Sequence, residues 1–172
     1  DEIVLAVTRL LEPSRKNVRL FVSHAKADLA ASNDAAKQVH DHIVTETTGH
    51  AFFDAVSLEA GTSLADQLDK AVDHGVFLAI RGDAYSSRTW CQRELLTAKR
   101  HELPSLTVEV LHKGEQRSSP YGGNGPSVVW DGNPAAIVSR AMIEWLRAAY
   151  FRKEARRFIT AAGLPSDTLV LA

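Results

Sequence analysis

The 172-residue chain contains a single cysteine, Cys91. One thiol excludes a disulfide within the chain and a zinc site built from cysteines, and it favours a reducing, cytoplasmic setting. An excess of charge of one sign is also missing, because 20 Lys and Arg stand against 21 Asp and Glu, for a net charge of −1. This balance argues against a dedicated nucleic-acid binder and against a binder of anionic membranes.

Long apolar runs are missing as well. The longest ones, such as Val76 to Ile80, are far too short to cross a bilayer, and no signal peptide is visible. Hydrophobic residues nevertheless make up 45% of the chain and charged residues 24%, which is enough for a well-formed core. Because the chain begins at Asp1 rather than at a methionine, we expect a segment of a longer protein.

Short apolar segments alternate with helical patterns along the chain. We expect strands at 18–24, 51–54, 76–80, 106–111 and 127–130, and helices at 28–47, about 63–75, 89–102 and 134–163. This alternation predicts an α/β fold, a flavodoxin-like three-layer sandwich with a five-stranded parallel sheet in the order 2-1-3-4-5. We expect one domain at 18–163, a connecting segment at 1–17 that is either a linker or a helix, and a second connecting segment at 164–172.

Two helix starts have clear local signals. Thr89 and Gln92 match the capping-box pattern, which predicts a helix with Thr89 at its N-cap. Asn133 followed by Pro134 predicts the start of the last helix, with proline at the first helical position.

The sheet topology predicts where a ligand would bind. Ligands of such sheets lie outside the carboxyl ends of the strands, at the switch point between strands 1 and 3. The loops at that point begin at Ser23-His24 and at Arg81-Gly82, and the second loop leads directly into Trp90. Trp90 and Glu94 are four residues apart on a helix and therefore neighbours on one face. The pair is either a functional site or a core tryptophan beside a solvated glutamate, and its location favours the site.

Three ordered motifs resemble the Toll/interleukin-1 receptor (TIR) domain, over residues 18 to 163. Phe21-Val22-Ser23-His24-Ala25-Lys26-Ala27-Asp28 is similar to its first signature box. Phe53-Asp54, then Leu58-Glu59-Ala60-Gly61 and the helix at Leu64, resemble its second strand and BB loop, although many members carry proline where this chain has Ala60. The segment from Ser86 to Leu95 matches the family's S-x-x-W-C-x-x-E-L pattern.

The resemblance implies an enzyme of the NAD-cleaving type. In such members the glutamate of this motif is catalytic in breaking the nicotinamide–ribose bond, a role that carries over to Glu94. Nicotinamide leaves as a neutral molecule, so a general acid is not required, and one carboxylate can stabilise the developing oxocarbenium charge. NAD is then the substrate, with no further cofactor and no metal. The resemblance also implies a homo-oligomer formed through the BB loop, and an immune or toxin effector, as in antiphage defence, fused to a sensor domain.

Further residues are candidates for substrate binding. Trp90 offers an apolar wall or a stacking surface. Ser23 and His24 end strand 1 across the crevice, where donors would meet ribose or diphosphate. Phe53 and Asp54 either line the pocket or serve as a core residue and a turn residue. Ser87 either binds substrate or helps Thr89 to cap the helix.

Several other signals are weaker. Arg81 is expected to be an exposed surface arginine rather than a phosphate ligand, and Cys91 a small packing residue rather than a nucleophile. His40 and His42 point to different faces of a helix, so metal binding there is not expected. The main rival function is a non-catalytic TIR module that mediates self-association or docks to a partner TIR domain. A more distant rival is a glycosyl-transfer enzyme on a similar sheet, such as a nucleoside deoxyribosyltransferase-like protein.

Overall fold

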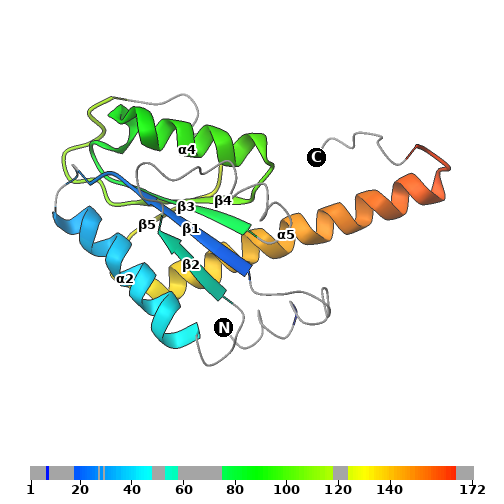
Figure 1. Ribbon diagram of the computed structural model, residues 1–172, viewed down its shortest axis with the longest axis horizontal. Helices are drawn as coiled ribbons and strands as arrows, with labels where there is room; N and C mark the ends of the chain where they lie inside the picture. The colour runs from blue at the N-terminus through cyan, green and yellow to red at the C-terminus, as the bar shows by residue number, and fades with distance from the viewer. Residues whose placement is uncertain are drawn as a thin grey trace.

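The computed structural model describes residue 7 and residues 18–26, 28, 30–47, 53–57, 75–117 and 124–165. The elements run along the chain as β1 (Val18–His24), α2 (Ala30–Thr47), β2 (Phe53–Ser57), β3 (Gly75–Arg81), the 3₁₀ helix η1 (Tyr85–Ser87), α4 (Thr89–Arg100), β4 (Ser105–Glu109), β5 (Ser127–Val129) and α5 (Pro134–Ala161) (Figure 1).

The five strands form one parallel sheet in the order β2-β1-β3-β4-β5. This is the order and direction that the sequence predicts. β3 lies at the centre between β1 and β4, and it is buried from Gly75 to Ile80. Because β1 and β3 are adjacent and parallel, their carboxyl ends meet at one edge, with Ser23 opposite Ala79 and His24 opposite Ile80.

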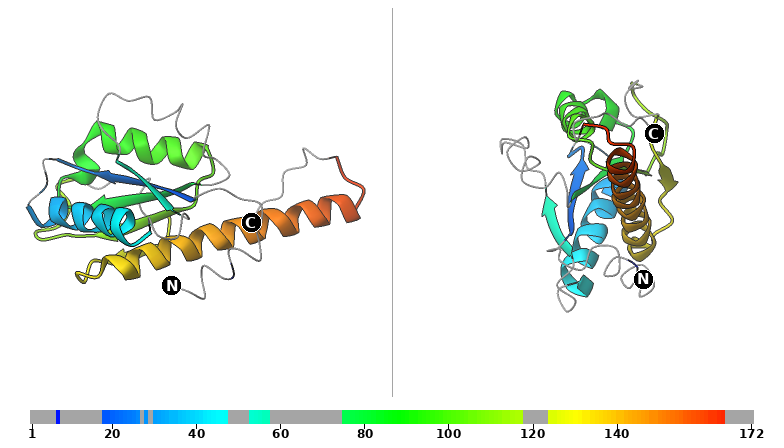
Figure 2. Two further views of the ribbon diagram at one scale, coloured as in Figure 1. Left: turned by 60° about the horizontal axis from the view of Figure 1, so that its bottom comes forward. Right: turned by 90° about the vertical axis from the view of Figure 1, so that its right-hand side faces the viewer.

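Helices cover both faces of the sheet and give three layers. Figure 2 shows α4 on one side and α2 with α5 on the other. The side chains of each strand alternate between the two faces, and the core divides accordingly. The face under α2 and α5 holds Leu20, Leu78 and Leu106 with Trp145 of α5, whereas the α4 face holds Phe21 and Phe77 with Cys91, Leu95 and Ala98 of α4.

The last helix begins as its sequence predicts. The Asn133 side chain accepts a hydrogen bond from the Ala136 backbone N–H, with Pro134 at the first helical position. The helix ends at Ala161, and Gly163 follows with a φ of 63°, in the left-handed region that favours glycine. Its C-terminal part extends well beyond the sheet (Figures 1 and 2).

Some predicted boundaries are wrong. The second strand is Phe53–Ser57 rather than 51–54, so the loop expected from residue 55 begins later. The fourth strand ends at Glu109 rather than at Leu111. The helix expected near 63–75 and the BB loop at 58–61 lie outside the described residues. The domain limits at residues 18 and 163 stay predictions. Among the helices that the structure describes, none combines the length and the apolar character needed to cross a membrane.

Candidate active site

Glu94 is a buried carboxylate on α4, in the layer that faces β1 and β3. It exposes 2% of its surface, beside the apolar side chains of Cys91 and Leu95. Burial raises the pKa of Glu94, and hydrogen bonds with the side chains of Ser23 and Trp90 oppose that rise. The sequence predicts that Glu94 is partly shielded from water, and the shielding is nearly complete.

The closest polar partner of Glu94 comes from β1. The Ser23 hydroxyl donates a hydrogen bond of 2.5 Å to Glu94 Oε2, and it lies 2.9 Å from the Tyr85 hydroxyl. Ser23 exposes 0% and Tyr85 3% of their surfaces. Ser23 is therefore a buried partner of the carboxylate, and a direct contact of its hydroxyl with substrate stays a prediction.

Trp90 lies at the first turn of α4, one helical turn before Glu94. The spacing of four residues puts the two side chains on one face of the helix, and Trp90 is among the groups that hold down the raised pKa of Glu94. Trp90 exposes 37% of its surface, which is inconsistent with a core tryptophan. Its exposed part is available to a ligand that approaches the buried carboxylate.

The loop after β3 carries Tyr85, and Asp28 holds this loop in place. Asp28 Oδ1 accepts a hydrogen bond of 2.6 Å from the Ala84 backbone N–H, and Ala84 precedes the 3₁₀ helix η1 that begins with Tyr85. Gly82 lies so close to Asp28 that a Cβ atom there would come within 2.5 Å of Asp28 Oδ2. Sequence reasoning missed Tyr85 and Asp28. A bulky aromatic in an otherwise small and polar loop at the switch point is the signal that would have found Tyr85.

A second set of hydrogen bonds joins the same loop to the segment after β4. The Asp83 carboxylate accepts hydrogen bonds from the backbone N–H groups of His112 and Lys113, and these bonds hold the pKa of Asp83 below its usual value. Ser86 Oγ donates to Glu115 at 2.6 Å. The loop that carries Tyr85 is thus hydrogen-bonded to Asp28 on one side and to the segment after β4 on the other.

His24 is not brought to Glu94. Successive residues of a strand point to opposite faces. Ser23 lies on the α4 face with Phe21, so His24 points to the other face. Partial burial, followed by the charge of Lys26, lowers the pKa of His24, and Asp28 opposes this shift.

Phe53 and Asp54 lie at the far end of the sheet. Phe53 pairs with Val18 and Asp54 with Arg19, whereas Ser23 is five residues further along β1. At about 3.3 Å per residue, this separates Phe53 from the level of Ser23 by about 16 Å along the strands. The sequence predicts that the second strand ends at Asp54, but β2 begins at Phe53 and runs to Ser57. Phe53 and Asp54 therefore lie at the amino end of β2, away from the edge of the sheet where Ser23 meets Glu94.

Ser87 does not cap α4. Its hydroxyl donates to the Ala84 carbonyl at 2.7 Å, within the η1 turn. The N-cap of α4 is Arg88, without a side-chain hydrogen bond. Thr89 is already the first helical residue, and the Gln92 side chain donates to the Ser86 carbonyl. The predicted capping box is therefore wrong.

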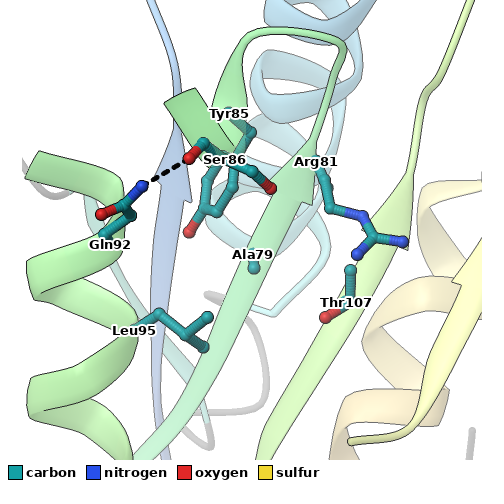
Figure 3. A pocket seen from close by; sticks show the side chains of 7 residues that line it. All are labelled: Ala79, Arg81, Tyr85, Ser86, Gln92, Leu95 and Thr107. Atoms are coloured by element: carbon teal, nitrogen blue, oxygen red, sulfur yellow. Dashed lines mark hydrogen bonds between the residues drawn. The ribbon is translucent and has the colours of Figure 1, made fainter. Parts of the chain in front are cut away.

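Arg81 is less exposed than the sequence suggests. Its guanidinium donates to Glu109 at 2.7 Å, and its Nε lies 3.6 Å from Glu115. Arg81 therefore already has carboxylate partners. It lines a small cavity on the α4 face together with Ala79, Tyr85, Ser86, Gln92, Leu95 and Thr107 (Figure 3).

This cavity is too small for a nucleotide. Its free volume of about 10 Å³ corresponds to roughly one water molecule. Figure 3 shows the Tyr85 ring between the β1 and β3 ribbons, with the Gln92 side chain hydrogen-bonded to Ser86. The cavity flanks Tyr85.

Cys91 lies in the apolar layer between α4 and the sheet. Burial, followed by the charge of Glu94, raises the pKa of the Cys91 thiol to about 12, so it stays protonated and is a poor nucleophile at neutral pH. Within the described ranges, His, Cys, Asp and Glu form no group of three or more that could hold a metal ion.

The chain matches a known protein family. A family model described as TIR domain matches residues 20–124, which is more than half of the 172-residue chain. The chain belongs to the TIR domain family. The matched region contains β1 from Leu20 onward, the η1 turn and α4, and therefore Ser23, Tyr85 and Glu94. The search of curated proteins found no significant match.

Two solved structures are similar to this TIR domain at a low level. A diflavin flavoprotein from Nostoc sp. has a TM-score of 0.45 and 15% identity, covering 79% of this chain and 96% of that chain. The sugar isomerase domain of an RpiR transcription factor from Sphaerobacter thermophilus has a TM-score of 0.44 and 12% identity, covering 90% and 86%. The fold itself rests on the strand order.

Proposed function

We propose that this TIR domain is an NAD glycohydrolase or cyclase, in which Glu94 is the catalytic residue. The observation that carries the proposal is a buried carboxylate at the switch point of the sheet, one helical turn after a tryptophan that is 37% exposed. The setting that we propose is an effector of immunity or antiphage defence in the cytoplasm, within a chain that also carries a sensor domain.

The chemistry needs one carboxylate. The bond between ribose C1′ and the pyridinium nitrogen breaks, and its electron pair goes to nitrogen, so that nicotinamide leaves neutral. Positive charge then develops on the ribose, and an ionised Glu94 beside it stabilises that charge more strongly where water is excluded. Water attacks C1′ and releases a proton to give ADP-ribose, or a nucleophile of the same molecule attacks to give a cyclic product.

Trp90 completes the site on the solvent side. Its indole lies one helical turn before Glu94 and is 37% exposed, so the exposed part of the ring can contact the cationic pyridinium or a base, a contact worth about 0.5–2 kcal/mol. In the described residues the carboxylate itself is almost covered. We propose that assembly of several copies, through TIR–TIR contacts that include the BB loop, opens or completes the site.

The second candidate function is a non-catalytic TIR module that binds other TIR domains. The 2% exposure of Glu94 favours it, because a carboxylate that never meets a substrate would also be buried and hydrogen-bonded. The enzyme should release nicotinamide from NAD, whereas the interaction module should not.

Nicotinamide release from NAD by concentrated protein tests the proposal. Glu94→Gln keeps an acceptor for the Ser23 hydroxyl but removes the charge, and we expect turnover to fall about 100-fold or more. The matched control is Glu154→Gln, which changes a glutamate of α5 that pairs with Arg157 and should leave turnover unchanged.

The folding of the variant is checked by its melting temperature. Because the pKa of Glu94 is raised in the folded protein, its ionisation above that pKa costs stability. A neutral glutamine should therefore melt at the same or a higher temperature at pH 7. Full activity in Glu94→Gln would refute the site assignment, and no turnover even in assembled wild-type protein would favour the interaction module.

A further inference from the structure

We propose that Tyr85 and Ser23 are positioning residues, which form a directed hydrogen-bond chain that fixes the Glu94 carboxylate. This inference rests on the proposed function for its meaning in catalysis. The hydrogen-bond chain itself is tested independently of NAD. Tyr85 is the new element, because the sequence motif around Trp90 and Glu94 assigns it no role.

The direction of the chain follows from a count of protons. A serine hydroxyl has one proton and can accept through its lone pairs. The Ser23 proton goes to Glu94 Oε2, so at the 2.9 Å contact between Ser23 and Tyr85 the tyrosine hydroxyl must donate. The order is Tyr85 to Ser23 to Glu94. The last bond, at 2.5 Å, has the length of a bond to a charged oxygen.

The surroundings of the chain make its geometry rigid. Tyr85, Ser23 and Glu94 expose 3%, 0% and 2% of their surfaces, so water is not available to replace a lost partner. They come from three different elements: η1, β1 and α4. Asp28 fixes the start of η1 through its bond to Ala84. A carboxylate held by a fixed donor keeps one rotamer, which leaves its second oxygen for the ribose.

Two other titratable groups in or beside this hydrogen-bond chain, Tyr85 and Cys91, keep their protons. Burial, followed by the charge of Cys91, raises the pKa of Tyr85 well above its usual value, and Arg81 of β3 opposes this. The pKa of the Cys91 thiol on α4 is about 12, with Asp28 among its causes. Tyr85 and Cys91 are therefore neutral at physiological pH, so Glu94 is the member of this group whose ionisation the hydrogen bonds affect.

Loss of either donor should make the carboxylate harder to ionise. Ser23→Ala removes the bond to Glu94 directly, so the pKa of Glu94 should rise. Tyr85→Phe keeps the ring and removes the donor to Ser23, so the pKa of Glu94 should rise by less. In the double variant Tyr85→Phe should add nothing to Ser23→Ala, because Tyr85 acts only through Ser23.

The experiment is a titration of the folded chain labelled with ¹³C in its glutamate carboxyl groups. The Glu94 signal is assigned by its loss in Glu94→Gln. Tyr150→Phe is the matched control, since Tyr150 exposes 56% of its surface on α5, and it should leave the titration of Glu94 unchanged. A merely structural role of Tyr85 predicts a lower melting temperature without a shift of this titration.

The pH profile of kcat/KM for NAD gives the catalytic readout. Below the plateau each unit of upward shift lowers kcat/KM about tenfold, and the plateau itself should change little in Tyr85→Phe. A Glu94 titration that is identical in wild type, Tyr85→Phe and Ser23→Ala would overturn the proposal. If the wild-type chain does not cleave NAD, the proposed function fails, while the titration still decides whether the hydrogen-bond chain exists.

Discussion

Gly82 and Asp28 meet at the loop that presents Tyr85, and the contact leaves no room for a side chain at Gly82. A Cβ atom there would lie 2.5 Å from Asp28 Oδ2 and 2.6 Å from Asp28 Cγ. The carboxylate cannot move away freely, because its other oxygen accepts the Ala84 N–H. Glycine is therefore required at this position by the neighbouring side chain.

Gly82→Ala should destabilise the fold for this reason. Overpacking of this kind costs about 1–3 kcal/mol, and the measurement is the free energy of unfolding in urea. Gly125→Ala is the matched control, since its Cβ would meet only Ser105 Oγ at 3.6 Å, an ordinary contact. Equal stability of the two variants would show that the Asp28 side chain can move aside at little cost in free energy.

The alternation of side chains along a strand decides which of Ser23 and His24 faces α4 and Glu94. Both end β1, and only one of them can face α4. Phe21, two residues before Ser23, lies in the core under α4. This distinction is available from the sequence once α4 is placed over strands 1 and 3, whereas the pairing of Ser23 with Tyr85 is not.

At the scale of elements, α5 depends on its first turn. Asn133 Oδ1 accepts the Ala136 N–H at 3.2 Å, and this bond satisfies a backbone donor that the helix leaves free. The helix packs Ile137, Met142 and Trp145 onto the sheet, so its start affects the core.

Asn133→Ala should therefore lower the free energy of unfolding by about 1 kcal/mol. For a domain of this size that corresponds to a fall of roughly 2–4 °C in melting temperature, measurable by circular dichroism. Asn124→Ala, at an exposed loop asparagine, serves as the control and should melt like the wild type. An unchanged melting temperature in Asn133→Ala would mean that water replaces the cap.

The sequence predicts the elements well where an apolar run has clear limits. β3 is a continuous apolar run bounded by Gly75 and Arg81, and its place follows directly. β2 is an edge strand, and its limits are set by pairing with β1, beginning with Phe53 opposite Val18. Such a register depends on a partner that is distant in the sequence, so the predicted strand at 51–54 is displaced. The false cap at Thr89 has a local cause, since the Gln92 side chain donates to the Ser86 carbonyl, six residues earlier, instead of capping the helix.

At the scale of the whole molecule, the site joins residues that no local pattern connects. Ser23 is 71 residues from Glu94 and 62 from Tyr85 in the sequence. The strand order brings β1 beside β3, and the two contacts then follow from the fold. The family motif identifies Glu94 because it is local. The hydrogen bonds that Tyr85 and Asp28 make are apparent only in three dimensions.

The burial of Glu94 also bears on how the whole molecule would work as an enzyme. In one chain the carboxylate exposes 2% of its surface and Trp90 37%, so a substrate meets the indole before it meets the charge. If contacts between copies open the site, the fraction of competent molecules depends on assembly, and the apparent activity falls in proportion to that fraction when chains are separate.

We therefore expect turnover per chain to rise steeply with protein concentration, or on addition of a crowding agent, and then to reach a plateau. The measurement is nicotinamide release over a concentration series, with the molar mass followed by light scattering in the same samples. Glu94→Gln should assemble over the same range without turnover, because it lacks the charge but keeps the surface. Turnover per chain that is constant from the monomer upward would exclude an assembly step, and the site would then have to open within a single chain.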